Sequence, residues 1–224
     1  MPPLKILFVC GFGSLGFDTY KNLTYLENVT YFYYEISSHM EDIERRLLDE
    51  YLACKYDVLM GHSCGCFMIT RLLPHLLDTQ KPKTTIFLNP FICNTWMTKC
   101  LGVLPHWISC MIPLLKWSGI SGDTFSHQSI WSMDEWRCNN VQLINYAAKN
   151  MFFDKFIKTY SENKITIIYG ECDPIATIPP NLQMALRAVT KFITIYAKHE
   201  PFKDDMVVQQ NLKNIIMQEL YLAI

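Results

Sequence analysis

The sequence has no excess of basic residues, which argues against a protein that binds nucleic acid. Lysine and arginine total 20 against 21 for aspartate and glutamate, so the chain offers no broad positive field to a phosphate backbone. It also lacks an apolar run of the roughly 20 residues that a membrane-spanning helix needs. The closest run, 101–117, contains two prolines, a histidine and a lysine, and it suits an amphipathic surface segment better than a span.

Patterns for metal binding and secretion are missing as well. The nine cysteines form no Cys-x-x-Cys pair, and Cys64 and Cys66 have no cluster of histidine ligands beside them, which argues against a zinc site. The N-terminal residues lack a cationic region and a small-residue cleavage site, so we expect no signal peptide. We therefore expect a cytoplasmic protein with reduced thiols and with no metal or other cofactor.

What the sequence does contain is a regular alternation of strand-like and helix-like segments, without an internal repeat or a low-complexity linker. Half of its 224 residues are hydrophobic, enough for the core of one large domain. Apolar, β-branched or aromatic runs predict six strands, at 4–10, 29–37, 56–60, 84–91, 164–170 and 191–197. Because helical patterns alternate with them, we predict an α/β three-layer sandwich, with a mostly parallel six-stranded sheet and helices on both faces.

The interval 92–163 differs from the rest of the chain. It holds all five tryptophans together with several prolines and methionines, and helical stretches are expected near 95–117 and 140–161. A structureless loop of this length is uncommon in a compact domain. We therefore predict a helical cap at 92–163, inserted into a core formed by residues 1–91 and 164–224.

A candidate nucleophile lies where the third strand becomes a helix. The segment Gly61-His62-Ser63-Cys64-Gly65 matches Gly-x-Ser-x-Gly, a pattern that places the serine on a sharp bend and exposes its hydroxyl. The two glycines leave room for the bend and for close packing of the helix on the strand. An ordinary tight turn is the simpler alternative. His62 is expected to be structural or to line the pocket.

A serine hydroxyl needs a base, and the base needs an acid that orients it. Asp173 follows the fifth strand and His199 follows the last one, so both should lie at the same edge of the sheet as Ser63. The chain order serine, acid, histidine is the order this architecture uses. Glu171 is a rival acid, and Asp173 could instead be a turn residue before a proline.

The glycine-rich segment after the first strand is a candidate oxyanion loop. Gly11 and Gly13 would let the backbone N–H of Phe12 approach the site, and the N–H of Cys64 at the start of a helix would supply a second donor. The same segment matches Gly-x-Gly-x-x-Gly, with Glu35 as an acidic partner in the next strand, so a nucleotide site is the alternative.

These residues together resemble proteins of the α/β-hydrolase fold over nearly the whole chain. The segment 61–65 matches the family's nucleophile turn, Asp173 its acid position and His199 its base position. Residues 10–14 match its His-Gly-x-Gly oxyanion loop, with a cysteine where histidine is common, which leaves Phe12 as the donor. The resemblance implies a compact member with six of the usual eight strands, beginning at the third, and a cap in the usual place.

The resemblance implies a serine hydrolase that acts on a small-molecule ester or a lipid. The tryptophans of the cap, Trp96 and Trp107 among them, would form an apolar roof over an acyl group, with Gly11 and His62 at the pocket. Cleavage of a thioester, an amide or a carbon–carbon bond is an alternative, and so is a non-catalytic binding protein on this fold. The apolar segments of the cap also allow transient contact with a membrane surface.

Overall fold

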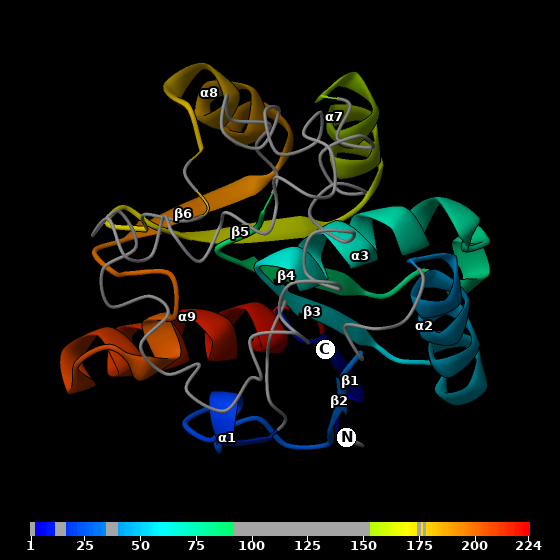
Figure 1. Cartoon of the computed structure of the whole chain (residues 1–224), viewed down its shortest axis with the longest axis horizontal. Helices are drawn as coiled ribbons and strands as arrows, with labels where there is room; N and C mark the ends of the chain where they lie inside the picture. The colour runs from blue at the N-terminus through cyan, green and yellow to red at the C-terminus, as the bar shows by residue number, and fades with distance from the viewer. Residues whose placement is uncertain (1–2, 12–16, 35–39, 92–152, 174–175, 177) are drawn as a thin grey trace, which may run out of the picture. The chain divides into compact units, whose positions relative to one another are not determined.

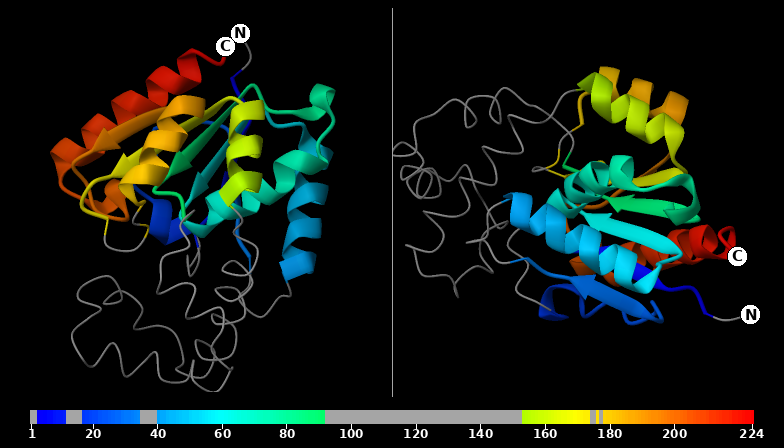
Figure 2. Two further views of the ribbon diagram at one scale, coloured as in Figure 1. Left: turned by 90° about the horizontal axis from the view of Figure 1, so that it is seen from above. Right: turned by 90° about the vertical axis from the view of Figure 1, so that its right-hand side faces the viewer.

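The computed structural model describes residues 3–11, 17–34, 40–91, 153–173, 176 and 178–224. Six strands form one sheet: β1 Ile6–Val9, β2 Val29–Phe32, β3 Val58–His62, β4 Thr84–Leu88, β5 Ile165–Gly170 and β6 Lys191–Ile195. Five of them lie close to their predicted ranges, whereas β2 ends at Phe32, before the predicted end at 37, and residues 35–37 lie outside the described residues. All neighbouring pairs are parallel, in the order β2-β1-β3-β4-β5-β6, so every strand ends at one edge (Figure 2). The predicted parallel α/β sheet is confirmed.

Helices cover both faces of this sheet (Figure 1). Their bounds are α1 Phe17–Tyr20, α2 Met40–Cys54, α3 Cys64–Leu72, α7 Phe153–Glu162, α8 Pro180–Val189 and α9 Met206–Tyr221. The segment around α1 and the helix α9 lie on one face, and α2, α3, α7 and α8 lie on the other. Short 3₁₀ turns follow α3, precede β4 and precede α9, at Leu73–His75, Asp78–Gln80 and Pro201–Lys203.

The strand order reverses direction beside β1, and this reversal positions the site. From β1 the chain moves outward to β2 and then returns to β3 on the other side of β1. In open parallel sheets, ligands bind beyond the carboxyl ends of the strands at such a reversal. Val9 of β1 is paired with Gly61 of β3, so the loops that follow these two strands leave the sheet side by side.

Helix α7 lies with the sheet, although the sequence division assigned its residues to the cap. The compact unit that contains the sheet resumes at Phe152. Tyr160 of α7 is fully buried, and its ring packs edge-on against Phe87 of β4 with 5.5 Å between the ring centroids. The rest of the predicted cap, residues 92–152, lies outside the described residues.

Helix α9 buries one face against the core. Leu212, Ile216 and Leu220 are buried, at the i, i+4, i+8 spacing of a helix face, whereas Ile215 is only partly buried. Glu219 is buried beside them because its carboxylate accepts hydrogen bonds from Thr166 and Lys191. A hydropathy pattern does not reveal such a polar contact.

Candidate active site

Ser63 occupies a strained turn between β3 and α3. Its φ is 51° and its ψ is −118°, a backbone conformation that residues with a side chain rarely adopt. Such strain persists only where the surrounding structure imposes it, and it is typical of the turn that exposes a nucleophilic serine. A Cβ added at Gly65 would lie 2.1 Å from the carbonyl oxygen of Val9, so the close approach of α3 to β1 requires glycine, as the sequence analysis expected.

Asp173 and His199 are brought together from two loops at the same edge. The His199 Nδ1 atom lies 2.7 Å from Asp173 Oδ2, and the Asp173 side chain has no exposed surface. The other carboxylate oxygen accepts a hydrogen bond from the N–H of Ala176. The rival acid, Glu171, is exposed to solvent. The carboxylate holds the Nδ1–H tautomer of His199, which leaves the lone pair of Nε2 available as a base.

The loop that carries His199 is fastened to the turn that carries Ser63. His62, the residue before Ser63, has its Nε2 atom 2.9 Å from the carbonyl oxygen of His199, and the two imidazole rings are 5.0 Å apart between centroids. The structure therefore ties the loop of the candidate base to the residue that precedes the candidate nucleophile, and no hydrogen bond between Ser63 and His199 is among the described contacts.

The thiol beside Ser63 does not compete with it as a nucleophile. Burial raises the pKa of Cys64 to about 12, so this thiol stays protonated at neutral pH. Cys64 is also the first residue of α3, and the first N–H groups of a helix have no partner within the helix. Its backbone can therefore donate to a developing oxyanion while its side chain stays inert.

The remaining predicted site residues divide into two groups. Phe12, Trp96 and Trp107 lie outside the described residues, as do Gly13, Gly16 and Glu35 of the alternative nucleotide site. Gly11 and His62 are buried, and both nitrogens of the His62 ring are occupied inside the protein. That arrangement fits the structural role expected for His62 better than contact with a substrate.

Two side chains at the site were missed by sequence reasoning, Tyr20 and Asn89. Asn89 is fully buried just after β4; its amide donates to the carbonyl oxygens of Lys198 and His199, and its Oδ1 accepts from the N–H of Gly170. The signal for it was an asparagine directly after a buried apolar strand, at the edge that carries the other candidates.

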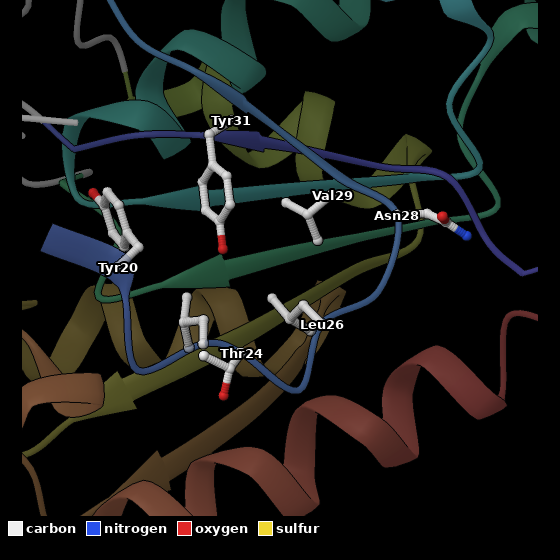
Figure 3. Close-up of a pocket in the computed structure, with 7 residues that line it drawn as sticks. Tyr20, Thr24, Leu26, Asn28, Val29 and Tyr31 are labelled. Atoms are coloured by element: carbon white, nitrogen blue, oxygen red, sulfur yellow. The ribbon is translucent and has the colours of Figure 1, made fainter. Parts of the chain in front are cut away.

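A separate pocket of about 420 Å³ lies beside the segment that joins α1 to β2 (Figure 3). Its lining residues come from α1, β2 and the segment between them: Tyr20, Leu23, Thr24, Leu26, Asn28, Val29 and Tyr31. None of them is a candidate catalytic residue. Among the residues that the structure describes, no three metal-ligating side chains gather into a site, and no helix is both long and apolar enough to cross a bilayer.

Comparison with known proteins shows a likeness in structure and none in sequence. No protein-family model matches the chain, and no curated protein sequence matches it. Among solved structures, ClbQ from the colibactin pathway is 18% identical with a TM-score of 0.63, and the alignment covers 97% of this chain and 99% of ClbQ. A carboxylesterase from the thaumarchaeon Nitrososphaera gargenis is 13% identical with a TM-score of 0.62, covering 99% and 91%.

Human thioesterase 2 is 11% identical with a TM-score of 0.61, and the alignment covers 98% of this chain and 97% of that one. These structures have the α/β-hydrolase fold. The fold of this chain is therefore the α/β-hydrolase fold.

Proposed function

We propose that the chain is a serine hydrolase that cleaves a carboxylic ester through an acyl-enzyme on Ser63. His199 is the general base and Asp173 the acid that orients it. The observation that carries this proposal is the buried contact of 2.7 Å between His199 and Asp173, in a loop fastened to the strained turn of Ser63. A binding protein would have no use for a buried carboxylate that fixes one tautomer of an imidazole.

In the proposed reaction, Ser63 Oγ attacks the ester carbonyl carbon while Nε2 of His199 takes its proton. The N–H groups of Cys64 and Phe12 stabilise the negative oxygen of the tetrahedral intermediate; losing one such donor typically costs 10² to 10³ in kcat. His199 then donates its proton to the departing alcohol, leaving the acyl-enzyme. Water, deprotonated by His199, attacks this acyl group, and the carboxylic acid is released.

Thioester hydrolysis is the second candidate. Several of the structures that resemble this chain are thioesterases, among them human thioesterase 2 and the thioesterase domain of the curacin pathway. The same nucleophile, base and acid serve both reactions, because they differ in the leaving group and not in the attack on the carbonyl.

We also propose that the acyl group is apolar and that the protein is cytoplasmic. The five tryptophans of the predicted cap support an apolar acyl site. Each buried methylene is worth about 0.8 kcal/mol, so kcat/KM should rise about fourfold per methylene until the site is filled. The described cysteines are all free thiols, which supports a reducing compartment.

The test is labelling of the purified protein with a fluorophosphonate, which reacts with an activated serine. We expect Ser63 to be modified and Ser63→Ala to remain unlabelled, while Ser161→Ala, which removes an exposed helix hydroxyl, labels like the wild type. A wild-type protein that is not labelled contradicts the proposal and favours a non-catalytic role. Initial rates on p-nitrophenyl esters from acetate to laurate, and on the matching acyl thioesters, then separate the two substrate classes.

A further inference from the structure

A chain of three hydrogen bonds runs from the end of β1 to the loop of the candidate base. The N–H of Gly11 lies 2.7 Å from the Tyr20 hydroxyl oxygen, and that oxygen lies 3.1 Å from Nδ1 of His62. The opposite ring nitrogen, Nε2 of His62, lies 2.9 Å from the carbonyl oxygen of His199. All four residues are buried. The acyl-transfer steps themselves use neither Tyr20 nor the side chain of His62.

The partners fix the direction of every hydrogen bond in this chain. A carbonyl oxygen only accepts, so Nε2 of His62 carries the proton and donates to His199. Nδ1 of the neutral ring is then an acceptor, and the Tyr20 hydroxyl donates to it while its oxygen accepts from Gly11. Burial lowers the pKa of His62 to about 3, with a further contribution from positive charge on His199, so the neutral form persists at neutral pH.

Packing prevents the two side chains from turning away from these partners. The ring of Phe202, which follows His199 closely in the chain, lies 5.0 Å from the rings of both Tyr20 and His62 between centroids. Phe8 of β1 packs against Tyr20 on another side, at 4.8 Å. Tyr20 is also part of the wall of the pocket in Figure 3. The hydroxyl and the imidazole therefore have fixed places in a close-packed region.

The geometry points to a positioning pair: Tyr20 and His62 set the distance between the oxyanion loop and the base. This inference rests on the proposed function. The first hydrogen bond of the series involves Gly11, the residue before the proposed donor Phe12, and the last one involves the backbone of His199 itself. His62 is also bonded covalently to Ser63. One imidazole thus connects the nucleophile, the base and the oxyanion loop.

Asn89 gives the base loop a second tie, which makes this inference testable. The carbonyl oxygen of His199 accepts from Asn89 as well as from His62, at 2.8 and 2.9 Å. Loss of the Tyr20–His62 connection therefore leaves the loop attached and the contact between His199 and Asp173 in place. When the Tyr20–His62 hydrogen bond is lost, we expect His199 to shift by a fraction of an ångström relative to the oxyanion loop, while the site stays folded.

The primary test is Tyr20→Phe, which removes one oxygen, compared with Tyr51→Phe. Tyr51 is also buried, and its hydroxyl donates to the carbonyl oxygen of Gln80 at 2.6 Å. Both residues shortly precede strands, β3 and β4, at the edge of the sheet opposite to the site. A misplacement of 1 Å can cost on the order of 100-fold in rate, so we expect Tyr20→Phe to lower kcat about tenfold or more. KM should stay within about twofold of the wild type, because the lost positioning matters in the transition state. Tyr51→Phe should lose about as much thermal stability as Tyr20→Phe, with kcat and KM unchanged.

Two substitutions of His62 each keep one of its two hydrogen bonds and remove the other. The amide nitrogen of a glutamine reaches the place of Nε2 and can still donate to His199, whereas an asparagine amide reaches the place of Nδ1 and can only bond Tyr20. Alkyl esters need a proton from His199 on their leaving group, and nitrophenyl esters do not. His62→Asn should therefore lose more activity on alkyl esters than on nitrophenyl esters, and His62→Gln should lose about equally on both.

The outcomes separate this inference from the proposed function. If the wild type is not labelled by a fluorophosphonate, the proposed function fails. If the wild type is labelled and Tyr20→Phe matches Tyr51→Phe in kcat and in labelling rate, the positioning pair alone is overturned. Should Tyr20→Phe not fold, the two His62 variants decide, and an identical loss on alkyl and nitrophenyl esters in both of them overturns the inference.

Discussion

Acid should destabilise the protein through His62, and the size of the effect follows from its burial. Desolvation, aided by repulsion from His199 and Lys203, lowers the pKa of His62 from 6.5 to about 3, against the opposing effects of the His199 carbonyl and Asp173. The unfolded chain binds a proton on this residue below about pH 6.5, whereas the folded protein excludes it down to about pH 3. Unfolding takes up a proton between these limits, so stability is lost as pH falls.

The expected loss is about 1.4 kcal/mol per pH unit below the unfolded pKa, or about 2 kcal/mol between about pH 7 and about pH 5. For a domain of ordinary stability, this is a substantial share of the total. The perturbation that isolates it is His62→Gln, which removes this titration and keeps a donor toward His199.

The assay is urea unfolding of both proteins, followed by circular dichroism at about pH 7, 6 and 5. We expect the wild type to be the more stable protein at about pH 7 and its advantage to shrink by about 2 kcal/mol at about pH 5. Other titrating groups cancel in the difference between the two proteins, provided that their m-values agree. A difference that stays constant over this range would refute the reasoning, because it would mean that His62 is not held neutral by the fold.

Three further substitutions test the acid, the turn and the last helix. Asp173→Asn should lower kcat by about 10⁴ in steady-state assays and leave the fold intact, because an amide does not hold the Nδ1–H tautomer of His199. Gly65→Ala should destabilise the protein by about 1–3 kcal/mol or more in urea unfolding, since its Cβ would meet the Val9 carbonyl oxygen at 2.1 Å. Asp205→Ala should cost about 1 kcal/mol and lower the melting temperature, because Asp205 Oδ1 accepts from the first N–H groups of α9; unchanged melting would contradict a capping role.

The sequence was sufficient to predict the sheet, because buried parallel strands are continuous apolar runs. The segments 4–10 and 164–170 are examples, and both form interior strands with a neighbour on each side. The positions of Ser63, Asp173 and His199 followed from the same pattern, since strands that run in parallel deliver the residues after them to one edge.

The limits of prediction appear where a contact depends on residues far apart in the chain. His62 bonds residues 42 and 137 positions away, and no periodicity records such a pairing. Helix α7 was grouped with the insertion because composition changes sharply at residue 92. A helix directly before a strand, as α7 is before β5, is nevertheless what the βα alternation requires, so this signal was present in the sequence.

The described contacts that hold the candidate machinery come from the sheet and its loops. Asn89 joins the end of β5, which precedes Asp173, to the loop of His199, because its side chain bonds both Gly170 and His199. His62 joins the loop of His199 to the turn that carries Ser63. Gly170 has to be glycine for this, because a Cβ there would lie 2.5 Å from the carbonyl oxygen of Ala197. In the proposed function, the reaction depends on these loops of the sheet, and the choice of acyl group depends on the proposed cap.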